Sequence, residues 1–317
     1  MSSNLRDSLT LTWKWLQDLN SDWLPIRSQE EVTRASWAKL VPSCADLPVV
    51  FQDFFESFTT DGHPFPYAVL TPSYLGYMHR ETEKLVFVLG AEIYILEASG
   101  DGYETICYPF GDIAYVETRS VLLDSSIKFS GVTRQGDRAV TSFRFNTVTA
   151  HLFSPILNGI RLAATDAPIT VRSSELEGFD HWGRVNFKFM NYARRSLLEG
   201  ETVVQAILQP EIRVKVMRVL GRAYYRTLSP PHATILTNQE LIVIREEQRR
   251  RSDEYGGLWD YIPLDKVAAL ALDRREDNLL TLAIDLPGEE SLAYLFEAAW
   301  QPELEQLMEK FREVKGE

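Results

Sequence analysis

The chain has 317 residues, of which 45% are apolar and 25% are charged, as in ordinary globular proteins. This apolar content excludes a wholly disordered chain, because it is ample for a packed core. The 45 acidic residues outnumber the 33 basic ones and give a net charge of −12. Such a charge disfavours sequence-independent binding of nucleic acid, because that binding depends on the neutralisation of phosphates.

Cysteine usage and the lack of long apolar runs indicate the compartment. Only Cys44 and Cys107 are present, which excludes a disulfide scaffold, and we expect both to be free thiols. The first residues, MSSNLRDSLTLTWKW, lack the apolar core of a secretion signal. No apolar run approaches the ~20 residues that a membrane span needs. We expect a soluble, cytoplasmic protein.

Residues 1–63 are predicted to be helical. Apolar residues recur at helical spacing from Leu9 to Leu19, and Ser28 with Glu31 forms a capping-box pattern ahead of a helix at 32–41. A third segment places four phenylalanines on one face: Phe51, Phe54, Phe55 and Phe58. We expect these apolar faces to pack on the next domain. A groove for a partner and a helix on a membrane surface remain alternatives.

From Tyr67 the sequence changes to short runs that predict antiparallel strands. These runs lie at 85–89, 92–97, 103–108, 113–118, 126–129 and 140–145. Asp101-Gly102, between the second and third runs, is a strong hairpin signal, because the turn needs a positive φ. Residues 147–163 predict a helix that Pro155 kinks or shortens.

A second set of the same elements follows a predicted linker at 166–185. It begins with a helix at 186–198, for which Gly200 is a plausible C-terminal cap. The predicted strands lie at 203–208, 233–237, 241–246, 259–262, 267–272, 280–285 and 291–296. A last helix begins near Gln301 and carries an apolar stripe.

Three anchor points recur in the same order and indicate an internal repeat. The matched pairs are Pro72 with Pro210, Gly90 with Asn238, and Pro109 with Pro263. Both residue types of the second pair accept the left-handed backbone of a tight turn. The separations grow from 138 to 148 to 154 residues, as expected if the second copy carries two insertions. We predict a first copy at 64–165 and a second copy, with its leading helix, at 186–317.

The second copy resembles the bacterial pleckstrin-homology (PH)-like domains. The resemblance rests on Thr237-Asn238, on 241–244, on Ile262-Pro263-Leu264 and on Val267. In the first copy Gly90 replaces the asparagine, and Phe110-Gly111 follows Pro109. The resemblance implies a seven-stranded, half-open barrel closed by a helix, in modules that act mainly by binding. We therefore expect an α+β protein of two PH-like bent-sheet barrels, each closed by a C-terminal helix and preceded by the N-terminal helical region.

No pattern for catalysis or metal binding is present. The chain lacks a glycine-rich nucleotide loop, a His-Glu-x-x-His motif and a Gly-x-Ser-x-Gly elbow. The five histidines lie far apart in the sequence: His63, His79, His151, His181 and His232. Asp180-His181 is more simply explained as part of a structural or exposed linker than as an acid–base site. We predict no catalytic residue, no metal and no cofactor.

Residues 212–251 are basic within an acidic chain. They hold nine basic and three acidic residues, a net charge of +6. The basic residues are Arg213, Lys215, Arg218, Arg222, Arg226, Arg245, Arg249, Arg250 and Arg251. Whether 212–226 forms a helix or begins as a strand, we expect the cations to gather on one side. In eukaryotic PH domains basic residues near the first strands hold phosphoinositide headgroups. The resemblance therefore implies an anionic ligand as one candidate for this segment.

Three explanations of this basic segment remain open. It is a solvated or internally paired face, an interface for protein carboxylates, or a site for anionic lipid or phosphorylated ligand. The net charge of the chain weakens the membrane alternative, because an anionic surface repels it. We expect a non-catalytic tandem PH-like module that binds a protein partner or itself. A peripheral binder of anionic membrane or phosphorylated ligand through 212–251 is the alternative, and an enzyme of unknown class is third.

Overall fold

The computed structural model describes residues 33–60, 64–75, 80–100, 102–163, 173–219, 222–247, 256–288 and 290–316. The helical pattern at 9–19 and the capping box at 28–31 lie outside these residues. The second predicted helix is wrong in its C-terminal part, because Lys39–Val41 form strand β1. This strand pairs antiparallel with Ala68–Leu70, so backbone pairing with a distant segment outweighs the local helical pattern.

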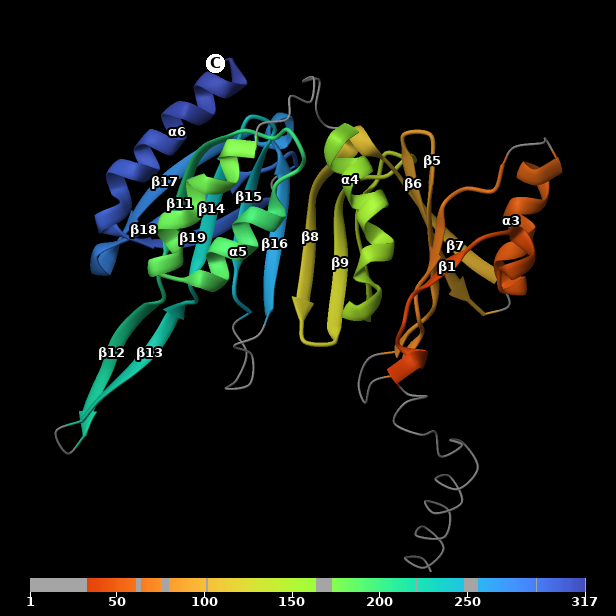
Figure 1. Cartoon of the computed structure of the whole chain (residues 1–317), viewed down its shortest axis with the longest axis horizontal. Coiled ribbons are helices and arrows are strands. Elements are labelled where there is room, and N and C mark those ends of the chain that lie inside the picture. The colour runs from red at the N-terminus through yellow and green to blue at the C-terminus, as the bar shows by residue number, and fades with distance from the viewer. Residues whose placement is uncertain are drawn as a thin grey trace, which may run out of the picture.

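The first half begins with a five-stranded antiparallel sheet (Figure 1). Its order is β1, β2 (Ala68–Leu70), β5 (Lys84–Leu89), β6 (Glu92–Ser99) and β7 (Gly102–Pro109). Two very short strands, β3 (Tyr74–Leu75) and β4 (Arg80–Glu81), pair between β2 and β5. Helix α3 (Val49–Thr60) covers one face of the sheet, where Phe51 and Phe55 are fully buried against Leu85 and Phe87.

Three long strands and a helix complete this half. The strands are β8 (Ile113–Val121), β9 (Asp124–Val132) and β10 (Arg138–Asn146). A 3-10 segment at Thr147–Phe153 leads into α4 (Ser154–Ala163). Pro155 therefore stands in the first turn of an α-helix, where a missing N–H costs nothing. Ile156 and Ile160 pack in one core with Val86 and Phe129.

The second half has the same kinds of element. It begins with a 3-10 segment at Ser173–Arg184 and helix α5 (Phe187–Ser196). Its strands are β11 (Val203–Gln209), β12 (Ile212–Val219), β13 (Arg222–Ser229), β14 (His232–Thr237), β15 (Glu240–Arg245), β16 (Gly256–Pro263), β17 (Ala269–Arg275), β18 (Leu279–Asp285) and β19 (Ser291–Glu297). Helix α6 (Gln301–Lys315) ends the chain and buries Leu304, Leu307 and Phe311.

One antiparallel sheet runs through both halves. Its seven strands have the order β10-β9-β8-β16-β15-β14-β11, and the two halves meet where β8 pairs with β16. The backbones approach closely there: a Cβ atom on Gly256 would lie 2.5 Å from the carbonyl oxygen of Ser120. We refer to this contact between β8 and β16 as the joint.

The α+β class and the C-terminal helix are confirmed. No closed barrel is found in the described part of the chain, and the half-open PH-like barrels stay a prediction. Strands β7 and β8 belong to different sheets, as do β16 and β17. At the joint β8 and β16 satisfy each other's exposed backbone edges, so the two halves share one sheet.

The cores of the two halves lie on opposite faces of the shared sheet. Val116 of β8 packs with the helix α4, and its register partner Tyr261 packs against the cluster that contains Phe189 of α5. Helices α4 and α5 therefore lie on one face, because register partners point to the same side. Tyr115, which points the other way, belongs to the core beneath β17–β19 and α6.

The order of elements after β1 and α3 occurs twice. Four strands, a 3-10 turn, three strands and a helix describe both 68–163 and 203–315, apart from the short hairpins. Pro109 and Pro263 end equivalent strands with φ/ψ of −59°/139° and −56°/139°. Gly90 and Asn238 both occupy the turn between the second and third strands, but only Gly90 has a positive φ. Asn238 instead accepts a hydrogen bond from the backbone N–H of Thr202 at 2.8 Å.

Part of the predicted linker is packed structure. Within the 3-10 segment Ser173–Arg184, Phe179 and Trp182 are buried and pack against Phe189 of α5. This segment and α5 together cover the face of β14, β15 and β16 that carries Ile242 and Ile244.

Candidate functional site

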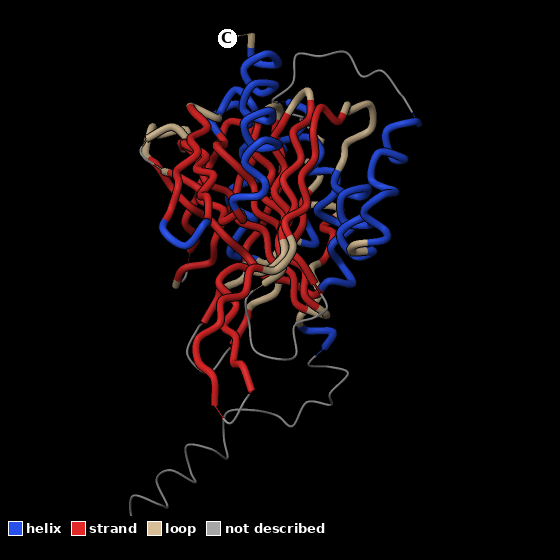
Figure 2. The backbone as a smooth tube through the Cα atoms, turned by 90° about the vertical axis from the view of Figure 1, so that its left-hand side faces the viewer, coloured by secondary structure: helices blue, strands red, loops and turns tan. Residues whose placement is uncertain are grey.

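Strands β12 and β13 form a hairpin that projects from the body of the protein (Figures 1 and 2). It is inserted between the first two strands of the second half, β11 and β14. Within the described residues these strands pair only with each other. Both outer edges of the hairpin therefore carry backbone N–H and C=O groups that a further strand could pair with. The strand alternative for the start of 212–226 is confirmed, and the helix is not.

The cations of the hairpin divide between its two faces. The register pairs Arg213 with Thr227 and Lys215 with Tyr225 on one face. Arg222 and Arg226 are opposite Val219 and Val214 on the other face. The expectation that all cations gather on one side is therefore wrong. The reason is the alternation along β13: Arg226 is the neighbour of Tyr225, the partner of Lys215, and neighbouring residues of a strand point to opposite faces.

Large apolar side chains stand exposed among these cations. Val216, Met217, Tyr224 and Tyr225 are between 53% and 62% exposed. Arg213 is ion-paired with Glu211, and Lys215, Arg222 and Arg226 are exposed. Met217 and Tyr224 are register partners on one face, and Tyr225 lies opposite Lys215 on the other, so each face of the hairpin exposes apolar surface beside a cation. Isolated exposed apolar residues are ordinary, but exposed apolar side chains grouped on one ribbon favour an interaction site. The side chain of Arg218 lies outside the described part of the molecule.

Arg245 has a different role from the hairpin cations. It lies on β15, and its guanidinium is 3.1 Å from Asp260 of β16 and 2.5 Å from Glu117 of β8. Burial acts to lower the pKa of Arg245, but Asp260, Tyr294 and Glu117 outweigh burial and raise it. Arg245 therefore stabilises the joint between the halves instead of facing a ligand. Three further cations of the predicted basic segment follow β15 in the chain and lie outside the described residues: Arg249, Arg250 and Arg251.

Arg161 of α4 makes a further charged contact between the halves, and the sequence patterns did not identify it. Its Nε atom lies 3.0 and 3.2 Å from the two carboxylate oxygens of Glu240. Its Nη2 donates to the carbonyl of Ser196 at 2.6 Å, and the guanidinium lies 4.0 Å from the centroid of the Tyr261 ring. The one available signal was Glu240 directly before a buried strand, since a buried carboxylate needs a partner.

A second buried carboxylate, that of Glu201, lies 3.7 Å from the same guanidinium. Burial, and then the negative charge of Glu240, raise the pKa of Glu201 to about 8. Glu201 also contacts the hydroxyl of Thr237 at 2.5 Å and accepts from the N–H of Leu198 at 2.8 Å. Glu201 therefore holds a proton at neutral pH, and the guanidinium of Arg161 lies closer to Glu240 than to Glu201.

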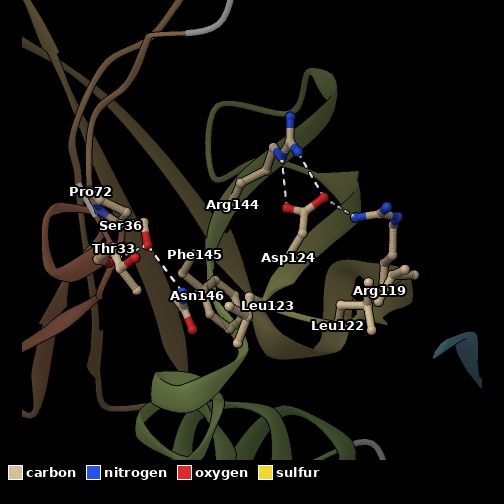
Figure 3. A pocket seen from close by; sticks show the side chains of 11 residues that line it. Thr33, Ser36, Pro72, Arg119, Leu122, Leu123, Asp124, Arg144, Phe145 and Asn146 are labelled. Carbon is tan, nitrogen blue, oxygen red and sulfur yellow. Dashed lines mark hydrogen bonds and ion pairs between the residues drawn. The ribbon is translucent and has the colours of Figure 1, made fainter. Parts of the chain in front are cut away.

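A pocket of about 500 Å³ opens beside the turn between β8 and β9 (Figure 3). Leu122 and Leu123 form this turn and are 62% and 59% exposed. Leu122 has a φ of 54°, which costs a non-glycine residue about 1–2 kcal/mol. Asp124 accepts hydrogen bonds from Arg119 at 2.6 Å and Arg144 at 2.8 Å. Arg119 is also paired with Glu247 at 2.7 Å, so both arginines that line the pocket are paired and the pocket presents mainly its apolar rim.

Among the described histidines, neither His181 nor His232 is joined to a nucleophile. His232 is buried, with its ring centroid 4.7 Å from that of Phe296, and burial lowers its pKa to about 4. His181 is exposed beside Trp182. Among the described residues neither histidine makes a hydrogen bond to Cys44, Cys107 or a carboxylate. The absence of catalytic residues remains a prediction.

Comparison of the chain with models of protein families found no match, and comparison with curated proteins found none either. Across the described ranges, no group of three or more His, Cys, Asp or Glu side chains could hold a metal ion. None of the helices in that part of the chain is long and apolar enough to cross a membrane. The features left to carry a function are the projecting hairpin and the surfaces around the joint.

Proposed function

We propose that the chain is a non-catalytic tandem PH-like module that binds an acidic surface of a protein partner through the β12–β13 hairpin. The observation that carries this proposal is the exposure of Met217, Tyr224 and Tyr225 beside cations on a hairpin with two unpaired edges. The partner is a second copy of this chain or another protein.

The repeated order of elements supports the tandem PH-like part of the proposal. Each half has four strands, a 3-10 turn that begins after a proline, three strands and a helix. The hairpin occupies the connection between the first and second strands of the second half, and the short β3–β4 pair occupies the same connection in the first. Connections of this kind are where binding residues are commonly carried, because a rigid sheet positions them.

The composition of the hairpin favours a protein partner over a membrane. Tyrosine, methionine and arginine are enriched in protein interfaces, and tyrosine and arginine are frequent among the few residues that supply most of the binding energy. The unpaired edges of β12 and β13 allow a partner to add a strand, with main-chain hydrogen bonds for affinity. An anionic bilayer would repel a chain whose net charge is −12.

A photo-crosslinking amino acid at Tyr225 tests the proposal in cells that express the chain. We expect a discrete crosslinked species at this position, and its loss when Arg222 and Arg226 are replaced by glutamate. Val49 is 79% exposed on α3, so a crosslinker there is the matched control and should capture nothing discrete.

Equal crosslinking from both positions, or none from Tyr225, would contradict the proposal. Sedimentation with lipid vesicles distinguishes the membrane alternative from a protein partner. Strong, salt-sensitive sedimentation of the unmodified chain with anionic vesicles but not with neutral ones would show that lipid, and not protein, is the ligand.

A further inference from the structure

A second concave surface lies at the joint, on the face of the shared sheet opposite the β17–β19 core. It is a cleft of about 280 Å³ between α4 and α5, above β8, β9 and β16. Ser154, Asn158 and Arg161 line it from α4; their spacing places them on one face of that helix. Arg195 lines it from α5 and Ser120 from β8. Ligand sites are frequent at such contacts between domains.

The lining of this cleft is rich in hydrogen-bond donors and poor in acids. None of its lining residues in the described part of the chain is Asp or Glu, whereas five hydroxyl residues of the sheet and α4 contribute to it: Thr118, Ser120, Ser125, Ser126 and Ser154. Serine and threonine hydroxyls, an asparagine amide and a guanidinium can all donate to one oxyanion. The hydroxyl of Ser125 already contacts that of Thr147 at 2.8 Å, but an apolar ligand would cut the remaining donors off from water, which is costly.

The charges around the cleft leave one cation unmatched. Arg161 at its floor is paired with Glu240 and with the carbonyl of Ser196. Arg195, in the last turn of α5, is exposed and makes no ion pair with another described residue. Its neighbour Arg194 differs, because it is ion-paired with Asp180. Arg194 is therefore a matched control for Arg195, because Arg195 lines the cleft whereas Arg194 is already paired with a carboxylate.

We propose that this cleft is a binding site for an oxyanion, the phosphate group of a small molecule, held by the fork of Arg195 and by the donors of Ser120, Ser154 and Asn158. Guanidinium groups bind phosphate through two parallel hydrogen bonds, which are stronger than neutral ones. The cleft is close to the lower end of the size range of ligand pockets, so it suits a small phosphorylated molecule and not a polymer. This proposal does not depend on the hairpin.

Titration calorimetry of the full chain with inorganic phosphate tests the site, with sodium chloride at equal ionic strength as the blank. We expect saturable phosphate binding to the unmodified chain and unchanged binding to Arg194→Gln. Arg195→Gln should weaken binding at least about tenfold, because it removes a charged donor. Asn158→Ala should weaken it by about threefold, as the loss of one neutral donor would.

Both arginine side chains lie on the surface of α5, so far-ultraviolet circular dichroism should show that both variants fold. Phosphate should raise the melting temperature of the unmodified chain and of Arg194→Gln, but not that of Arg195→Gln. The proposal is overturned if phosphate gives no saturable heat, or if the two arginine variants bind equally. It is also overturned if Arg222→Gln with Arg226→Gln abolishes phosphate binding while Arg195→Gln preserves it, because the hairpin would then be the site.

Discussion

The arginines of the joint and the cations of the hairpin have the same chemistry and opposite surroundings. Arg161 and Arg245 are held by carboxylates of the other half, at the contact of β8 with β16. Arg222 and Arg226 stand exposed on a hairpin that leaves the body of the protein. The difference indicates that the first pair stabilises the fold, because a cation taken out of water must be neutralised. The second pair is exposed and available to a partner, which is why we propose recognition for it.

The largest effect that would test this comparison is the removal of Arg161. Arg161→Met should destabilise the chain by about 3–5 kcal/mol, because Glu240 would stay buried without a counter-charge. Urea unfolding measures the loss. The double variant Arg161→Met with Glu240→Gln should recover a large part of it, since no unpaired charge then remains. A loss below about 1 kcal/mol for the single variant would mean that Arg161 is not needed at the joint.

The strands were largely predictable from the sequence, but their partners were not. Alternating apolar residues identified most strands, and Asp101-Gly102 identified the turn between two of them, because these are local features. The pairing of β8 with β16 joins residues such as Val116 and Tyr261 that lie far apart in the chain. Nothing local distinguishes an edge strand that will find such a partner. For the same reason the helical pattern before Pro42 did not reveal that Lys39–Val41 would join a sheet.

The candidate site was predictable in part for a similar reason. Charge counting found the segment that became the hairpin, because a cluster of cations is visible without a fold. It could not separate Arg245 from that cluster, because the separation depends on Glu117, which comes from the other half. Arg161 has the sequence context of any amphipathic helix, so only the packing of α4 on the joint reveals its partner Glu240.

The protonated carboxyl of Glu201 gives a smaller effect that depends on pH. Its pKa rises from 4.5 to about 8 on folding, so between these values the folded chain holds a proton that the unfolded chain has released. Stability should therefore fall as pH rises, by about 1.4 kcal/mol per unit from this group. His232 has a pKa lowered from 6.5 to about 4, which adds the opposite slope below pH 6.5. The fall is therefore clearest between pH 6.5 and 8, where it reaches about 2 kcal/mol.

Glu201→Gln isolates this contribution, because glutamine keeps the shape of the protonated acid and cannot ionise. Urea unfolding at several pH values between 6.5 and 8 should show a flatter profile for the variant. Asp260, whose pKa burial also raises, is present in both chains and does not affect the difference. Parallel profiles for the two chains would contradict the account of one arginine shared between two carboxylates.

The smallest change in the free energy of unfolding is expected for substitutions on the hairpin. The comparison requires this change to be small, because exposed cations do not hold the fold together. Arg222→Gln with Arg226→Gln should reduce the unfolding free energy by less than about a fifth of the loss for Arg161→Met, because substitutions at exposed sites without partners are nearly neutral. The same urea experiment measures it. If the double variant is strongly destabilised, the hairpin cations are part of the folded framework. They would then be paired within the molecule, and the assignment of recognition to the hairpin would fail together with the contrast between the two groups of cations.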